Sequence, residues 1–175
     1  MEIICEKINK EMLQQVYLLH KQKLGEGYLD YKHFEKLAGE NKLLVAFEDC
    51  VVGYLTIDIL KEDEFFISKR IPLKASSEEI IVFNTCASKY EKMGIGGRLF
   101  EFALKRFATN KKVYCPVWKC GENINAHKLL TRFGFARLIT LEKFWYDESL
   151  NAQNFCPVCG SPCVCDNVIY LKKES

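Results

Sequence analysis

Apolar residues recur along the chain with two different periods, and segments of the two kinds alternate. In residues 11–24 and 95–107 they follow one another at intervals of three and four, as in helices with one buried face. Residues 2–8, 41–49 and 50–60 are short runs rich in Val, Ile and Leu, which is typical of strands. Glu48-Asp49, between the last two runs, indicates a hairpin turn.

The rest of the chain continues the alternation. Residues 61–77 contain many charges, Pro72 and two serines without a sustained period, so we expect a partly irregular connection there. Asn110 and Gly134 are suitable helix stops. The remaining predicted elements are a helix over 31–38, strands over 78–86 and 111–118, a helix opened by Asn123 or Asn125, and strands over 135–146 and 167–173. The order β-α-α-β-β-β-α-β-α-β-β predicts a mixed α/β sheet covered by helices.

Composition narrows the class of protein. A chain of 175 residues fits one domain over residues 1–175. Its 25 basic and 23 acidic residues are interspersed, so no nucleic-acid face or polybasic membrane anchor is indicated. The first apolar stretch is broken by charges, unlike a signal peptide, and no run is long enough to span a membrane. We therefore expect a cytoplasmic monomer or homodimer with neither nucleic acid nor membrane among its partners.

A glycine cluster, EKMGIGG at residues 91–97, joins a predicted strand to a predicted helix. A helix start offers about four unpaired N–H groups and a partial positive charge, and glycine lets a phosphate approach them closely. The same cluster also suits a flexible turn with no ligand. A dinucleotide fingerprint is disfavoured because the third glycine is misplaced, and a P-loop is excluded because Gly-Lys-Ser/Thr is missing.

The surroundings of this cluster resemble a known family. From Leu43 to Gly134 the sequence is similar to the GNAT family of acetyl-CoA-dependent N-acetyltransferases, in the turn Glu91–Gly96, in Gly53 of the third strand, and in Gly134-Phe135 after the late helix. Glu91 replaces the usual Gln or Arg. The resemblance implies the GNAT fold: a mixed, mostly antiparallel sheet of about seven strands with about four flanking helices. It also implies acetyl-CoA as co-substrate, bound by Cys86, Glu91, Lys92, Met93, Gly94, Ile95, Gly96, Gly97 and Asn123.

The resemblance further implies direct transfer of acetyl from the thioester to a primary amine, which we expect to belong to a small molecule. A backbone N–H near Cys86 would face the thioester oxygen. Glu79 is the nearest match to the family's general base, although it is one residue out of register and equally suits an exposed strand end. Leu130 stands where many members have a proton-donating Tyr. Tyr114 or water would then supply that proton, or none is needed.

The role of Asn123 and the functional class of the protein stay open at this point. Asn123 suits both a contact to the cofactor or acceptor and a helix cap. Because Leu130 and Glu91 depart from the family pattern, an acyl-CoA-binding or regulatory module with little turnover is the alternative to an enzyme. A module that recruits nucleic acid or another partner through cysteines is disfavoured by the balanced charge.

Four of the nine cysteines lie close together near the C-terminus. Cys156, Cys159, Cys163 and Cys165 follow the pattern Cys-x2-Cys-x3-Cys-x-Cys. Four thiolates are typical ligands of structural zinc. Three cysteines plus another ligand, an iron–sulfur cluster, and disulfides or free thiols are the alternatives. We expect residues 154–166, the cysteine knuckle, to form an insertion between the last two strands. The family's corresponding hairpin lies near the acceptor entrance, so the knuckle would shape one wall of the acceptor pocket.

Overall fold

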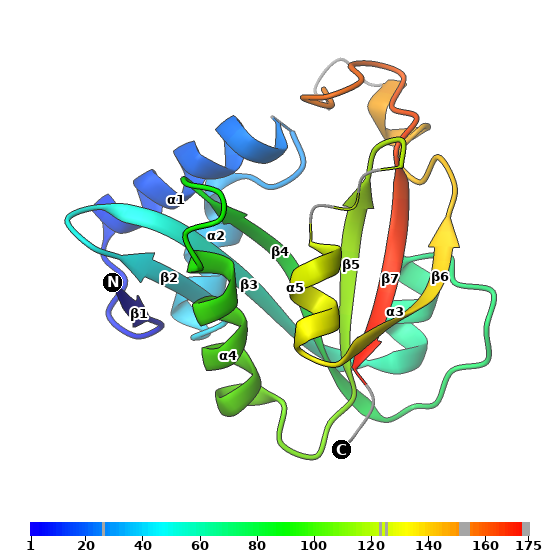
Figure 1. The fold of residues 1–175 in the computed structure, drawn as a ribbon, viewed down its shortest axis with the longest axis horizontal. Helices are drawn as coiled ribbons and strands as arrows, with labels where there is room; N and C mark the ends of the chain where they lie inside the picture. The colour runs from blue at the N-terminus through cyan, green and yellow to red at the C-terminus, as the bar shows by residue number, and fades with distance from the viewer. Residues whose placement is uncertain (26, 123, 125, 151–154, 173–175) are drawn as a thin grey trace.

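The computed structural model describes residues 1–25, 27–122, 124, 126–150 and 155–172. Helices and strands alternate along the chain (Figure 1). The elements are β1 (Glu2–Ile4), α1 (Lys10–Leu24), α2 (Tyr31–Gly39), β2 (Leu43–Phe47), β3 (Val51–Lys61), α3 (Glu62–Ser68), β4 (Glu79–Ser88), α4 (Ile95–Phe107), β5 (Val113–Lys119), α5 (His127–Arg132), β6 (Phe135–Leu141), a 3-10 turn (Glu148–Leu150) and β7 (Asp166–Lys172).

The strands form one seven-stranded sheet with the order β1-β2-β3-β4-β5-β7-β6. Every neighbouring pair is antiparallel except β4 and β5, which are parallel. The predicted mixed, mostly antiparallel sheet is therefore confirmed. Among the described residues, no helix is both long and apolar enough to cross a membrane.

Helices cover both faces of this sheet (Figure 1). On one face, α4 and α5 bury Leu99, Phe100 and Leu130 against the central strands. On the other, α1 and α2 pack over β2 and β3, while α3 packs farther along the sheet. Each face of the sheet is therefore covered by its own set of helices.

Two segments differ from the sequence prediction. Residues 62–68 form α3 where we expected an irregular connection, because this helix has only seven residues and spans too few turns to show a helical period. Three acidic residues in its first turn favour the helix through the peptide dipoles, and Phe65 and Phe66 anchor it. The sixth strand ends at Leu141 rather than residue 146, because Phe144 turns away to pack against Lys69 and Arg70 after α3.

Parallel strands β4 and β5 pair at only two positions before they separate. Ile81 lies opposite Val113 and Val82 opposite Tyr114, and no later pair is formed between these two strands. Residues 83–88 of β4 and 115–119 of β5 diverge instead (Figure 1). We call this gap the slot; it opens toward the C-terminal ends of both strands.

Candidate active site

The backbone of β4 presents hydrogen-bond donors to the slot. Ala87 lies opposite Tyr54 in β3, and the N–H of Lys89 donates to the carbonyl of Val52 at 2.8 Å. Because antiparallel pairing directs alternate N–H groups to opposite sides, the N–H of Cys86 points away from β3 and toward the slot. This is the geometry expected of a donor to a thioester oxygen.

The thiol of Cys86 lies on the α4 face of the sheet, where it packs against the core. Burial raises the pKa of this thiol to about 12. The thiol therefore keeps its proton at neutral pH and is a poor nucleophile. The side chain thus suits an apolar contact beside a bound ligand.

The glycine turn, residues 91–97, lies at the open end of the slot. Gly94 has φ +76° and immediately precedes α4, and a Cβ added to it would meet no atom within 4 Å. The first helical bond runs from the N–H of Arg98 to the carbonyl of Gly94 at 3.1 Å. The N–H groups of Ile95 and Gly96 precede this bond and receive no side-chain cap, so they are available to an anion.

The other glycines act through packing. A Cβ on Gly53 would lie 2.6 Å from Cγ2 of Ile95, so only glycine lets the start of α4 reach β3. A Cβ on Gly96 would lie 3.3 Å from Cδ2 of Leu129 in α5, and one on Gly97 would lie 3.7 Å from Cδ1 of the same residue. Because Gly96 and Gly97 lack side chains, α4 can approach α5 closely.

The remaining predicted cofactor residues divide into two groups. Glu91, Lys92 and Met93 are exposed around the turn, and Lys92 adopts a left-handed φ of +60°. Their side chains thus point to solvent, so contacts from this segment fall to the backbone. Asn123 lies outside the described residues.

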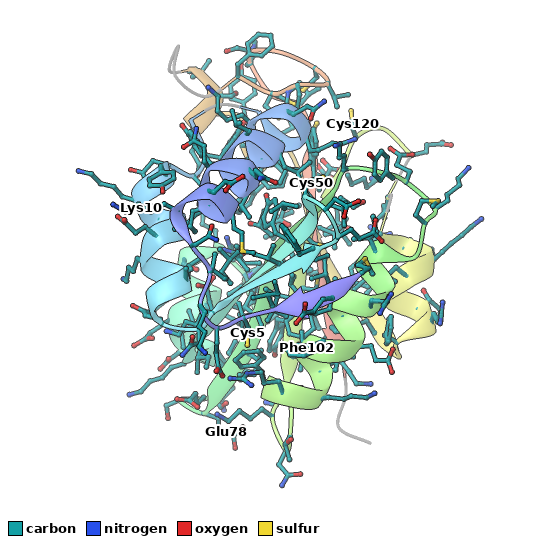
Figure 2. The ribbon with its side chains drawn as sticks, turned by 90° about the vertical axis from the view of Figure 1, so that its left-hand side faces the viewer. Cys5, Lys10, Cys50, Glu78, Phe102 and Cys120 are labelled. Atoms are coloured by element: carbon teal, nitrogen blue, oxygen red, sulfur yellow. The ribbon has the colours of Figure 1, made fainter. Side chains whose placement is uncertain are left out.

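Glu79, the predicted base, lies far from the slot. It precedes the two paired positions of β4, at the closed end, and it is exposed and paired with Lys111. Seven residues separate it from Cys86, about 20 Å along a strand. Figure 2 shows its neighbour Glu78 at the opposite end of the molecule from Cys120, which packs beside the cysteine knuckle. This position does not suit a general base, so the exposed-end interpretation is the better one.

Tyr114, the predicted acid, is buried on the α3 face at the last paired position. Its hydroxyl donates to Oε1 of Glu62 at 2.5 Å. Burial acts to raise the pKa of Glu62, but hydrogen bonds from Tyr114, Ser76 and Lys112 outweigh it and lower this pKa to about 2. The phenol is therefore held by a structural network rather than aimed at the slot.

A carboxylate that the sequence did not indicate lies nearer the slot. Asp58 of β3 is half-buried on the α1, α2 and α3 side, opposite Val82, the last residue of β4 that pairs with β5. Asn84, at the bulge where β4 leaves β5, donates a side-chain hydrogen bond to it. Burial raises the pKa of Asp58, and the charges of His33 and Lys69 oppose this only in part.

The four clustered cysteines converge on one point. Four of their sulfur–sulfur distances are between 3.4 and 4.0 Å, and all four sulfurs lie within 4.8 Å of one another. Sulfurs that bind one zinc ion tetrahedrally at about 2.3 Å are about 3.8 Å apart. The prediction that all four thiols form one cluster is confirmed, and its geometry fits zinc.

The cysteine knuckle is anchored at two places. The hydroxyl of Ser149 accepts from the N–H of Cys163 at 2.6 Å, and Trp118 of β5 packs against the cluster. On its other side the knuckle touches the loop between α1 and α2: a Cβ on Gly25 would lie 2.5 Å from the carbonyl oxygen of Phe155. Figure 1 shows the knuckle beyond the ends of β5 and β7, next to the end of α1.

A family model described as "Acetyltransferase (GNAT) family" matches residues 10–135. This match includes the slot, the glycine turn and α5. It stops before the cysteine knuckle, so the knuckle is outside the part of the chain that the family pattern covers. A comparison of the sequence with curated proteins finds no match.

Solved structures share the fold. Arabidopsis thaliana NAA60 in complex with a bisubstrate analogue has a TM-score of 0.69 at 18% identity, over 97% of each chain. Arabidopsis thaliana Naa50 with the bisubstrate analogue CoA-Ac-MVNAL has a TM-score of 0.66 at 19% identity, over 99% of this chain and 98% of that one. A Drosophila melanogaster polyamine N-acetyltransferase has a TM-score of 0.62 at 11% identity, over 97% of this chain and 99% of that one.

Proposed function

Because the chain belongs to the GNAT family of acetyltransferases, we propose that it transfers the acetyl group of acetyl-CoA to a primary amine by direct attack in a ternary complex. The observation on which this rests most is the slot: β4 and β5 separate after two paired positions, with the uncapped start of α4 at the open end. A gap between strands holds an extended ligand, and a helix start beside it binds that ligand's phosphates.

Acetyl-CoA would lie in the slot on the α4 side. Its pyrophosphate would accept from the N–H groups of Ile95 and Gly96, with the bare surface of Gly94 allowing close approach. The N–H of Cys86 would donate to the thioester oxygen as negative charge develops on it. Neither contact needs a particular side chain, which is why Glu91 is tolerated in place of Gln or Arg.

The acceptor amine would enter from the α1 and α2 side. Asp58 and Asn84 lie on that side at the level where the slot begins. We assign Asp58 the removal of the proton from the attacking nitrogen through intervening water, because Val82, which lies opposite Asp58, is four residues or about 13 Å before Cys86 along β4. A carboxyl whose pKa is raised by burial is a better base at neutral pH than an ordinary one.

The acceptor would be small. In this structure the cysteine knuckle and the loop after α1 touch through Phe155, Pro157 and Gly25. Their contact would narrow the acceptor entrance that we place between these two segments, which favours a compact amine over an extended peptide. Neighbours with this fold include a polyamine N-acetyltransferase as well as a complex with a peptide-containing bisubstrate analogue, so the fold itself permits either acceptor.

Zinc would be the ion held by the cysteine knuckle. Cys156, Cys159, Cys163 and Cys165 would supply all four ligands, so the ion would be structural and have no position open to substrate. Its binding energy would stabilise a segment that has little other regular structure.

A panel of acceptors tests the proposal. Protein of measured zinc content is mixed with acetyl-CoA and either small amines (diamines, polyamines and amino sugars) or short peptides with a free N-terminal amine, and release of the CoA thiol is followed. We expect release with at least one small amine and slower release with every peptide. Faster reaction with a peptide than with any small amine would overturn the small-acceptor assignment. No release with any amine would count against the transferase.

A further inference from the structure

A buried tyrosine and an exposed histidine are paired on the cofactor side of the sheet. Tyr170 of β7 is 1% exposed, and its hydroxyl lies 2.8 Å from Nδ1 of His127, the first residue of α5. The two rings are 6.0 Å apart. With Nδ1 protonated, His127 donates to the phenolic oxygen and leaves the phenolic hydrogen free to point elsewhere.

This pair lies at the level where the slot begins. Tyr170 is directly opposite Cys115 in β5, and Cys115 follows Tyr114, the last residue of β5 that pairs with β4. Phe83, Cys115, Leu130 and Tyr170 belong to one buried cluster beneath α4 and α5. Strands are about 4.8 Å apart, and Cys115, the small residue of β5 opposite Tyr170, lies between β7 and the slot.

Acetyl transfer creates a need for a proton on the departing sulfur. When the amine nitrogen forms its bond to the carbonyl carbon, the carbon–sulfur bond breaks and its electron pair stays on sulfur. Leu130, on the same face of α5 one turn after His127, has no proton to give. On this face, Leu130 of α5 offers only a hydrocarbon side chain, whereas Tyr170, paired with His127, offers a hydroxyl that can give a proton.

We propose that Tyr170 is the general acid that protonates the departing sulfur of CoA and that His127 returns the proton from solvent, an inference that rests on the proposed transferase function. The phenolic O–H bond breaks as the sulfur–hydrogen bond forms. As the Nδ1 proton of His127 passes to the phenolate, Nε2 of the exposed imidazole takes a proton from water, so the ring stays neutral. Together with the proton lost by the amine, the products are an amide and free CoA.

The surroundings of Tyr170 keep its phenol protonated. Burial raises the pKa of its phenol, the charge of Arg137 opposes this in part, and Cys115 adds to it. The phenol is therefore protonated throughout the neutral range. His127 is exposed at the start of α5, so the pair connects the buried phenol to water.

The test compares Tyr170→Phe and His127→Gln with wild type in the full chain, using an amine that wild type acetylates. We expect Tyr170→Phe to lower kcat about 10- to 100-fold, and His127→Gln to lower it several-fold, while the KM for acetyl-CoA changes less than about twofold. Tyr54→Phe is the matched control, because it also removes a buried hydroxyl bonded to a histidine, that of His20 at 2.7 Å, but in β3 under α1. Its kcat should stay within about twofold of wild type.

An acetyl donor with a better leaving group distinguishes a general acid from a residue that only supports the structure. The Se-acetyl analogue of acetyl-CoA releases a selenolate, which is a weaker base than a thiolate and leaves without a proton. The defect of both variants should shrink with this analogue. A kcat of Tyr170→Phe equal to wild type, or an equal defect with both donors, would overturn the assignment of the acid while leaving the transferase intact. No transfer by wild type with any amine would overturn both.

Discussion

At the scale of single residues, Gly53 and Gly94 are needed for different reasons. Gly53 is required by crowding, because a Cβ there would strike Ile95 at 2.6 Å and push α4 from the sheet. Gly94 has open space around it, and glycine is needed there because its backbone adopts a left-handed conformation with φ +76°. A glycine in open space beside a helix start leaves room for a ligand, whereas a crowded glycine leaves none.

Replacing Gly94 therefore tests the cofactor site. We expect Gly94→Ala to raise the Kd for acetyl-CoA about tenfold, because the new Cβ occupies the surface that the pyrophosphate approaches, and to cost about 1–2 kcal/mol of stability through its left-handed backbone. Gly134→Ala is the control, since Gly134 has φ +79° after α5 and a Cβ there would meet only the flexible end of Lys172. Isothermal titration should show weaker binding in the first variant alone; equal Kd values in both would contradict the assigned site.

Asp58 is the residue whose charge we expect to matter most for the amine. Since burial raises the pKa of its carboxyl in the folded protein, ionisation of Asp58 lowers stability as pH rises through that raised pKa. Asp58→Asn should therefore unfold at a higher temperature than wild type at pH 7, and the difference should vanish at a pH below the ordinary pKa of 3.8.

The same variant should be a poor catalyst. We expect Asp58→Asn to lower kcat by about 100-fold and to flatten the acid limb of the pH–rate profile, on which wild-type activity rises as Asp58 loses its proton. Asp49→Asn, in the exposed turn between β2 and β3, is the charge-matched control. A normal pH profile in Asp58→Asn would exclude this carboxylate as the base.

The residues that the sequence indicated are those whose chemistry is local. The glycine turn and the cysteines each lie within about ten residues, so spacing alone brings them together. Asp58 depends on Asn84, and Tyr170 on a partner 43 residues away, so their roles arise only once strands are in register. Glu79 was assigned to a strand correctly, but its distance from the slot depends on where β4 and β5 stop pairing.

At the scale of elements, the connection between β6 and β7 contacts both the end of α3 and the cysteine knuckle. Arg70 after α3 pairs with Glu148 and lies over the ring of Phe144, while Ser149 holds the knuckle. The long connection between β6 and β7 is therefore fixed by contacts at both ends. The sequence predicted the knuckle from its spacing but not the turn that precedes it, because Phe144 continues the apolar pattern of β6.

Loss of the metal should affect the acceptor more than the cofactor. We expect about one zinc per chain in wild type, by elemental analysis, and none in Cys159→Ser. In this variant the KM and relative rates for different amines should change, while the Kd for acetyl-CoA stays within about twofold, because the glycine turn lies at the start of α4 and the knuckle lies beyond the ends of β5 and β7 (Figure 1). Cys50→Ser, a free cysteine at the turn between β2 and β3 (Figure 2), is the control. Unchanged amine selectivity after zinc loss would refute a role of the knuckle in the acceptor wall.

At the scale of the whole molecule, the sheet would separate the two proposed substrates. α4 and α5 cover the face from which acetyl-CoA would enter the slot, and α1, α2 and the knuckle surround the other (Figure 1). The two substrates would meet only where β4 and β5 separate, so both can be bound at once without displacing each other. The proposed direct transfer in a ternary complex is compatible with this arrangement, and it needs no covalent intermediate on the protein.

The stoichiometry of the products tests this central claim most directly. Wild-type protein is incubated with acetyl-CoA and the best amine of the panel, free CoA is titrated as thiol, and the acetylated amine is counted by mass spectrometry. The account predicts one acetylated amine for each CoA released, in excess over protein. Tight binding of acetyl-CoA without either product, or CoA release without an acetylated amine, would contradict it.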